Sequence, residues 1–263
     1  RRLRPRRPEP AVARRQRLDA ELVRRALVAS RVDAARAIDE HRVTVNGAVA
    51  DKASRQVHAG DAILVAGDGP RFVSRGGEKL DAALEAFGID VAGRRVLDAG
   101  ASTGGFTDCL LQRGAAHVVA LDVGHGQLHP KIRHDERVTV IERFHVRDAT
   151  TEVIGGAVDV VVADLSFISI IRVLDALIRV CVPGGALALL VKPQFEAGRA
   201  EVSKGHGVIT DPAVHERVRG EVHEALVARA CTVVGWIDSP ITGGDGNREF
   251  LVHAVVERSG SDA

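Results

Sequence analysis

The stretch Arg95-Val-Leu-Asp-Ala-Gly-Ala-Ser-Thr-Gly-Gly-Phe106 decides the fold of the larger part of this chain. A short apolar strand runs into a glycine-rich turn, and a helical segment follows. Gly100 permits a tight turn, while Gly104 and Gly105 would let a ligand approach the backbone at the helix N-terminus. Asp122 ends the next predicted strand, where a carboxylate can accept both hydroxyls of a ribose. Together these features predict a nucleoside-binding α/β fold.

The spacing of the turn indicates which nucleoside it suits. Asp-x-Gly-x-x-x-Gly-Gly, beginning at Asp98, differs from the Gly-x-Gly-x-x-Gly pattern of dinucleotide enzymes. No Walker-type lysine follows the glycines, which disfavours ATP hydrolysis. The pattern suits a nucleoside without a pyrophosphate, such as S-adenosyl-L-methionine. The predicted cofactor-binding residues lie in this turn and at strand ends: Asp98, Gly100, Ser102, Thr103, Gly104, Gly105, Phe106, Asp122 and Asp164.

Apolar strands and amphipathic helices alternate after residue 74, which predicts a doubly wound, mostly parallel sheet with helices on both faces. The predicted strands are 95–98, 117–122, 138–141, 158–164, 186–192, 232–238 and 249–256. The predicted helices are 78–87, 105–113, 169–181 and 212–229. Because no helix separates the last two strands, we expect an antiparallel hairpin at one edge. The fold class is therefore Rossmann-like α/β, with a small α+β domain in front.

The front domain is predicted at residues 14–66, as two helices and a short sheet. Ser30 is expected to cap its second helix, and Asn46-Gly47 to form a hairpin turn. Residues 67–73 have the composition of a linker, and 74–257 form the larger domain. The predicted tails are 1–13, which is basic and flexible, and 258–263.

Charge is divided unequally between the two parts. Residues 1–66 carry 15 basic and 8 acidic side chains, whereas 67–263 carry 21 basic and 27 acidic. A basic front end on an acidic body predicts that the front end meets a polyanion. With one Trp and no Tyr, aromatic stacking is not the expected main mode of binding. The predicted phosphate contacts are Arg14, Arg15, Arg17, Arg24, Arg25, Arg31 and Arg42.

Lysine is scarce in this chain, with five lysines among 36 basic residues. Arg stays protonated in proteins, so a lysine kept under this bias can do what Arg cannot and act as a base. The alternative is a structural ion pair. Lys192 ends one apolar strand, Asp164 ends another, and Glu249 opens the last, so all three are expected at one sheet edge. With Lys79, near the start of a helix, they form the predicted catalytic set.

The sequence predicts neither a metal site nor a membrane span. Cys109, Cys181 and Cys231 are widely spaced, without the spacing of metal ligands, which predicts a reducing cytoplasm and no metal site. No secretory signal is visible. The most apolar stretch, 158–191, is interrupted by charged residues and is not expected to span a membrane.

The strings Val-Ser-Arg-Gly-Gly-Glu-Lys-Leu (73–80), Leu-Asp-Ala-Gly-Ala-Ser-Thr-Gly-Gly-Phe (97–106), Ala-Asp-Leu-Ser-Phe-Ile-Ser (163–169) and Val-Lys-Pro-Gln-Phe-Glu (191–196) resemble the TlyA family. The four predicted catalytic residues resemble the Lys-Asp-Lys-Glu tetrad of FtsJ-like RNA ribose 2′-O-methyltransferases. Residues 14–66 resemble the S4-type RNA-binding domain that precedes the methyltransferase domain in this family. The resemblance covers about residues 14–257.

This resemblance implies transfer of a methyl group from S-adenosyl-L-methionine to the ribose 2′-hydroxyl of cytidine in ribosomal RNA. It implies ribosomal RNA or ribosomal subunits as partners, with neither DNA nor a membrane. Lys192 would be the base or the group that steers the oxygen. The family often has an Asn where this chain has Phe144-His-Val-Arg-Asp148, so Asp148 or His145 is expected near the adenine.

Alternatives stay open at this point. A non-catalytic ribosome assembly or RNA-binding factor, or a Rossmann-like enzyme with a small substrate, would also fit the fold. A membrane-lytic protein, as the family's historical haemolysin label suggests, is disfavoured because the chain has no predicted span and no Trp- and Leu-rich amphipathic helix. The sequence leaves open the role of His125, the methylated nucleotide, the ribosomal subunit and the oligomeric state.

Overall fold

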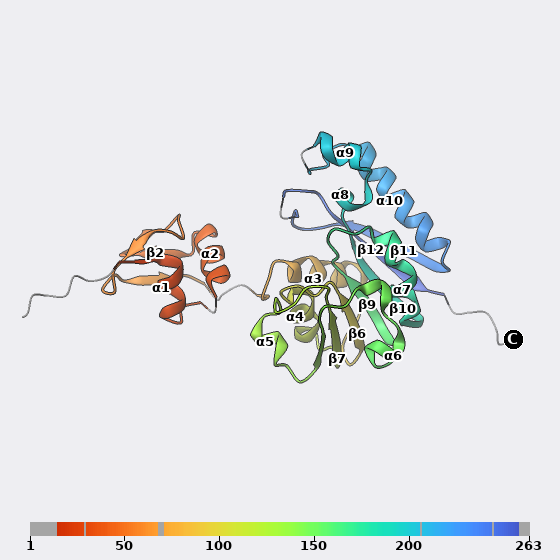
Figure 1. Cartoon of the computed structure of the whole chain (residues 1–263), viewed down its shortest axis with the longest axis horizontal. Helices are drawn as coiled ribbons and strands as arrows, with labels where there is room; N and C mark the ends of the chain where they lie inside the picture. Colours follow the sequence, from red (N-terminus) through yellow and green to blue (C-terminus); the bar gives the residue numbers. More distant parts are fainter. Residues whose placement is uncertain (1–14, 29, 68–70, 206, 244, 258–263) are drawn as a thin grey trace, which may run out of the picture. The chain divides into compact units, whose positions relative to one another are not determined.

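The computed structural model describes residues 15–28, 30–67, 71–205, 207–243 and 245–257. The chain divides into two compact units, residues 1–71 and 72–263, and the division falls inside the predicted linker (Figure 1). Each unit has a hydrophobic core of its own. The predicted tails, and Arg14 with them, lie outside the described residues.

The first unit is a small α+β module, as predicted. Its helices are α1 (Leu18–Arg24) and α2 (Arg31–Asp39), and its strands are β1 (Gln16–Arg17), β2 (Val43–Val45), β3 (Ala48–Val49), β4 (Gln56–Val57) and β5 (Ile63–Val65). β2 pairs antiparallel with both β3 and β5. Ser30 caps α2, because its Oγ accepts the Asp33 backbone N–H. Asn46 and Gly47 both have positive φ, 53° and 82°, as a two-residue hairpin turn requires.

The second unit contains a seven-stranded sheet in the order β11-β12-β10-β9-β6-β7-β8. The strands are β6 (Arg95–Ala99), β7 (His117–Leu121), β8 (Val138–Ile141), β9 (Val158–Ala163), β10 (Cys181–Val191), β11 (Cys231–Asp238) and β12 (Phe250–Val256). β12 runs antiparallel to both of its neighbours, β10 and β11, while the other pairs are parallel. The predicted Rossmann-like class and the antiparallel hairpin are confirmed.

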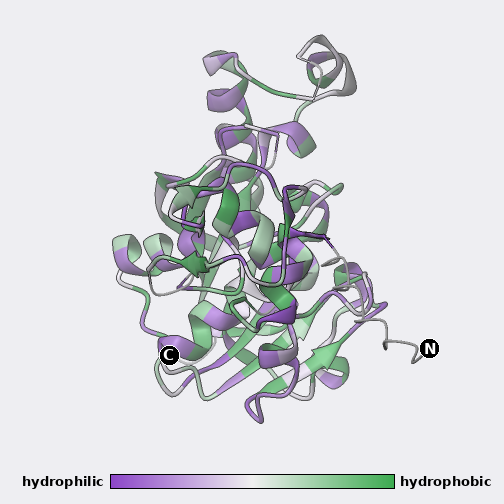
Figure 2. Ribbon diagram, turned by 90° about the vertical axis from the view of Figure 1, so that its left-hand side faces the viewer, coloured by the Kyte–Doolittle hydropathy of each residue, from purple (hydrophilic) through white to green (hydrophobic). Residues whose placement is uncertain are grey.

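Helices cover both faces of this sheet. They are α3 (Gly76–Phe87), α4 (Gly105–Gln112), α5 (Pro130–Arg133), η1 (Val146–Asp148), α6 (Thr151–Ile154), η2 (Ile170–Val173), α7 (Leu174–Arg179), α8 (Pro193–Glu196), α9 (Arg199–Lys204) and α10 (Pro212–Val227). Neighbouring strand residues alternate between two cores: Val96 packs with α3 and α4, and Leu97 with α7 and α10. Hydrophobic residues dominate the strands in Figure 2.

The structure differs from the prediction around residues 169–181. The expected single helix is a 3₁₀ turn, η2, followed by the short helix α7, and β10 begins at Cys181 rather than at residue 186. The pairing of β10 with β9 shifts between Cys181 and Ala186, where Pro183-Gly-Gly interrupts the apolar pattern. The short helices α5, α6, α8 and α9 were not predicted, since four to six residues are too few to show a helical period.

Candidate active site

Four elements bring the predicted catalytic residues to one edge of the sheet. Asp164 follows β9 and Lys192 follows β10, and parallel strands end at the same edge. Glu249 precedes the antiparallel strand β12, whose first residue, Phe250, pairs with Val191. The start of one strand therefore lies beside the end of the other. Lys79 comes from the first turns of α3.

The first ion pair joins Lys79 to Glu249, with Nζ 2.6 Å from Oε2 and both side chains buried. Gln194 Nε2 also donates to Glu249 Oε1 at 3.4 Å. The contact ties α3 to the beginning of β12, although the two residues are 170 positions apart in sequence.

The second ion pair joins Lys192 to Asp164, with Nζ 2.5 Å from Oδ1. Lys192 Nζ also donates to Ser166 Oγ at 3.0 Å, and it lies 5.9 Å from the centre of the Phe195 ring. Each of the two lysines therefore contacts a carboxylate of its own.

Two adjoining cavities meet at these pairs. The smaller, of about 280 Å³, is lined by Lys79 and Lys192 together with Arg75. The larger, of about 1250 Å³, extends to Asp122 and to the segments 144–147 and 194–198. Both linings include Gly100, Ser102, Asp164 and Ser166. A molecule in the larger cavity can therefore present one end to the lysines.

Most of the predicted cofactor-binding residues line these cavities. Asp122 borders the larger one, and its carboxylate accepts the Ser102 backbone N–H at 2.8 Å and that of Gly124 at 2.6 Å. These contacts fix the carboxylate at the end of β7, the position that suits ribose hydroxyls. The smaller cavity is lined by Gly100, Ser102, Thr103, Gly105, Phe106 and Asp164.

The glycines of the turn are also required by contacts of the chain with itself. A Cβ at Gly105 would lie 2.2 Å from Ser74 Oγ, so this glycine lets α4 pack closely against the start of α3. Gly100 has φ +87°, and a Cβ there would lie 2.5 Å from the Asp164 carbonyl oxygen. Gly104 has φ +95°, and its nearest neighbours are Leu128 and Ile132. Contacts of the chain with itself therefore require the three glycines.

Asp98 does not border either of the two cavities. It is fully buried, Thr107 Oγ1 donates to its Oδ2 at 2.6 Å, and its Oδ1 has no hydrogen-bond partner among the described residues. Burial raises the pKa of Asp98 to about 7, against the hydrogen bond from Thr107. Asp98 therefore contacts Thr107 of α4, and its predicted contact with the cofactor has no support from the linings of the two cavities.

The two residues predicted to lie near the adenine, Asp148 and His145, differ in their position relative to the cavities. Asp148 is exposed and borders neither of these cavities, which leaves its predicted contact without support from the geometry. His145 lines the larger cavity, and its Nδ1 accepts the Arg147 backbone N–H. His125 lies 2.8 Å from Glu142 through Nδ1, and the same carboxylate accepts the Gly126 N–H. His125 therefore helps to fix the loop after β7.

Sequence reasoning missed Phe167, the most exposed large hydrophobic side chain in the described residues, at 92%. Its φ is +65°, a conformation that bulky residues rarely adopt. Its ring centre lies 5.4 Å from that of Phe195, and both residues line the larger cavity. The apolar sequence around Phe167 resembles core, so the sequence held no signal for an exposed ring.

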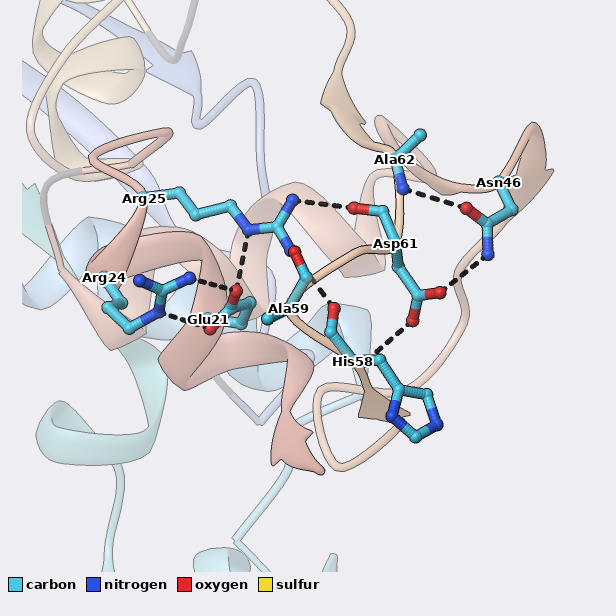
Figure 3. A network of polar contacts seen from close by, with 8 residues as sticks. All are labelled: Glu21, Arg24, Arg25, Asn46, His58, Ala59, Asp61 and Ala62. Carbon is cyan, nitrogen blue, oxygen red and sulfur yellow. Dashed lines mark hydrogen bonds and ion pairs between the residues drawn. The ribbon is translucent and has the colours of Figure 1, made fainter. Parts of the chain in front are cut away.

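The predicted phosphate-binding arginines differ in how far they are available. Arg25 donates to three backbone carbonyls (Figure 3). Arg42 donates to one, so these two arginines mainly hold the fold of the first unit. Arg15 Nε donates to the His58 ring. The remaining three are paired with acids on α1 and are about half exposed or more: Arg17, Arg24 and Arg31.

The described residues contain neither a metal-binding cluster nor a membrane-spanning helix. No group of three or more His, Cys, Asp or Glu residues there has the arrangement of a metal site. No helix in the described part of the chain is long and apolar enough to cross a bilayer.

Comparison with known proteins agrees with the geometry. The FtsJ-like methyltransferase family matches residues 72–255, and the S4 domain matches residues 16–63. The 16S/23S rRNA (cytidine-2′-O)-methyltransferase TlyA of Mycobacterium tuberculosis is 50% identical over 247 residues, which cover 92% of this chain and 90% of that protein. A solved structure, described as a candidate haemolysin from Streptococcus thermophilus, is 39% identical with a TM-score of 0.74, covering 93% of this chain and 90% of that one. The chain therefore belongs to the TlyA family of FtsJ-like methyltransferases, with an S4 domain in front of the methyltransferase domain.

Proposed function

We propose that this protein transfers a methyl group from S-adenosyl-L-methionine to the ribose 2′-hydroxyl of cytidine in ribosomal RNA. The observation that carries the proposal is the pair of lysine–acid contacts at the junction of two cavities, one of which suits a nucleoside. The name of the M. tuberculosis relative supports cytidine and ribosomal RNA. Its site of action would be the cytoplasm, where ribosomes are assembled.

The residues of the larger cavity fit S-adenosyl-L-methionine. Asp122, fixed by two backbone N–H groups, would accept the ribose hydroxyls of the cofactor. His145 and Phe144 line the part of the cavity that would take the adenine. When bound, the cofactor supplies an electrophilic methyl group on a sulfonium. Ser102 and Asp164 border both cavities, so they would lie between the cofactor and the RNA.

Lys192 would hold the attacking oxygen. Its Nζ is already fixed by Asp164 and Ser166, which leaves one N–H bond to direct at the ribose 2′ oxygen. The bound cofactor would supply the methyl group and keep the electrons of its S–C bond, and the hydroxyl proton would pass to the Asp164 carboxylate of the Lys192–Asp164 pair. Holding the two reactants in line can itself lower the barrier, by up to about 7 to 11 kcal/mol in the best-oriented reactions. Lys79 and Glu249 would support this geometry from α3 and β12.

Phe167 would position the target nucleotide. An exposed ring held at the mouth of the larger cavity offers a stacking surface for a base turned out of its RNA. Because the chain has one Trp and no Tyr, stacking of bases on aromatic side chains was not expected as its main mode of RNA binding. That composition does not exclude one ring placed at the site.

The test is labelled methyl transfer to unmethylated ribosomal subunits by the wild type and by Lys192→Ala. We expect label in RNA that resists alkaline cleavage at one nucleotide, and no label with the variant. Lys131→Ala is the matched control, because Lys131 pairs with Asp108 on another part of the same unit and borders neither cavity. Calorimetry should show cofactor binding by all three proteins. Wild-type RNA binding without methyl transfer would instead favour a non-catalytic assembly factor, and activity of Lys192→Ala near that of the wild type would contradict the role of Lys192.

A further inference from the structure

Two acids on α1 lie buried among the arginines of the first unit. Asp19 is 5% exposed and Glu21 is 2% exposed. A buried carboxylate needs ion pairs or hydrogen bonds to stay charged. On a surface expected to bind a polyanion, the negative charge of a carboxylate also weakens the electrostatic attraction for that polyanion. The contacts of each acid indicate why it is there.

Glu21 performs a structural task. Its Oε1 accepts from Arg25 Nε at 2.7 Å, and the Arg25 guanidinium reaches on to the carbonyl oxygens of the loop 58–61 (Figure 3). Arg25 is only 21% exposed. This network ties the C-terminal end of α1 to a distant loop, and it leaves little of Arg25 for a ligand.

Asp19 has a different arrangement. Arg17 forms a fork on it, with Nε 3.1 Å from Oδ1 and the terminal nitrogen Nη2 3.0 Å from Oδ2. Arg31 adds Nη2 at 2.7 Å from the same Oδ2. Because both terminal nitrogens contact one oxygen, they lie no more than about 6 Å apart. The Arg17 and Arg31 side chains remain 48% and 61% exposed.

Without a carboxylate between them, two guanidinium groups this close would repel each other and rotate apart. Asp19 removes the repulsion, and its hydrogen bond with Arg17 holds the pKa of Asp19 well below its usual range, so the charge persists. Each guanidinium has five donors, and Asp19 takes two from Arg17 and one from Arg31. Three donors of Arg17 and four of Arg31 therefore remain, on side chains that are 48% and 61% exposed.

We propose that Asp19 is a positioning residue that presents Arg17 and Arg31 as a two-arginine clamp for a phosphodiester group of RNA. Arginine favours such planar, forked recognition of phosphate. Fixing two long side chains before binding removes much of the entropy cost of ordering them in the complex. The inference rests on the proposed function only in taking RNA as the ligand.

Asp19→Asn separates this idea from simple electrostatics. Removal of a negative charge should strengthen RNA binding if Asp19 does nothing but repel phosphate. The clamp predicts binding weaker by about fivefold to tenfold, because two rotamer-rich side chains lose their order. The measurement is binding of an unmethylated ribosomal RNA transcript to the full-length protein without cofactor, over a series of salt concentrations. Since no methyl transfer is involved, the result is independent of the catalytic proposal.

Glu40→Gln is the matched control. Glu40 is an exposed acid of the same unit, 41% accessible, and it pairs with Arg36 and Arg42. It undergoes the same change of charge, and we expect unchanged or slightly tighter binding. The salt slope gives a second readout: it should stay near the wild-type value in Asp19→Asn, because both arginines remain. It should fall by about 0.7 to 0.9 in Arg17→Ala, which loses one phosphate contact.

Asp19 also accepts the Ala20 backbone N–H, so thermal unfolding must show that the variant is folded. If it is not, Arg17→Lys decides the question, because it keeps the charge and loses the fork. The clamp predicts at least threefold weaker binding for this variant, in the range of one ordered side chain. Wild-type or tighter binding by folded Asp19→Asn, or by Arg17→Lys where Asp19→Asn does not fold, would overturn the proposal.

Discussion

Asp98→Asn is expected to stabilise the second unit above neutral pH, although it removes a residue of the glycine-turn motif. Asp98 is fully buried, and burial raises its pKa from 3.8 to about 7. One pKa unit corresponds to about 1.4 kcal/mol. The buried charge therefore costs on the order of 4 kcal/mol of folding stability wherever Asp98 is ionised.

The sign of the pH dependence follows from the raised pKa. Between pH 3.8 and 7 the folded state holds the proton and the unfolded state has lost it, so stability falls as the pH rises. Above pH 7 this loss is complete. Asparagine does not titrate, and its amide oxygen can keep the hydrogen bond from Thr107. The gain in stability from Asp98→Asn should therefore be about 2 to 3 kcal/mol larger at pH 8.5 than at pH 5.

The assay is urea unfolding of wild type and variant at both pH values, followed by fluorescence. Trp236 is the only Trp of the sequence and lies in β11, so its emission reports on the second unit. Asp175→Asn is the control: Asp175 is exposed and paired with Arg229, which lowers its pKa, so its small contribution has the opposite sign. The reasoning is refuted if the stability difference between Asp98→Asn and wild type is the same at pH 5 and pH 8.5. Cofactor affinity should change little, because Asp98 borders neither cavity.

Three further substitutions test other parts of the structure. Gly105→Ala places a Cβ 2.2 Å from Ser74 Oγ, so unfolding should show a loss of about 1–3 kcal/mol and methyl transfer should fall as α3 shifts. Asn247→Ala leaves the Ile209 N–H and a carbonyl without a buried partner, and should cost about 1–3 kcal/mol in urea unfolding. Phe167→Ala should lower kcat/KM for RNA about tenfold through lost stacking and leave the melting temperature unchanged, because the ring is exposed. An unchanged kcat/KM would remove Phe167 from the site.

The sequence was informative where the chain repeats a simple period. Apolar runs and helical stripes located the seven strands and the long helices, and the rule that parallel strands end at one edge brought Asp164 and Lys192 together. The rule could not tell which acidic residues at that edge are buried and which line a cavity. Asp98 near the end of β6 and Asp122 just after β7 come from similar apolar segments, yet Asp98 is buried against Thr107, while Asp122 lines a cavity. Which one is covered depends on packing from α4.

Contacts between residues that are distant in sequence could not be predicted from the sequence either. Nothing in the local pattern distinguishes Arg25, which holds a loop 33 to 36 positions away, from Arg24, which stays on the surface of the same helix. The exposed ring of Phe167 depends on a positive φ that the residue type disfavours. Such features arise from tertiary contacts that outweigh local preference, and they concentrate near sites of function.

The two lysine–acid pairs indicate which unit supplies the electrostatic attraction for RNA. Each lysine proposed for catalysis is matched by a carboxylate, so the paired groups carry little net charge toward a phosphate. The second unit as a whole has more acidic than basic side chains, whereas residues 1–66 have 15 basic and 8 acidic ones. We therefore expect the attraction of RNA to come mainly from the first unit, through contacts that salt weakens steeply. On the proposed mechanism the paired lysines orient one hydroxyl, and they are not required to attract the RNA that carries it.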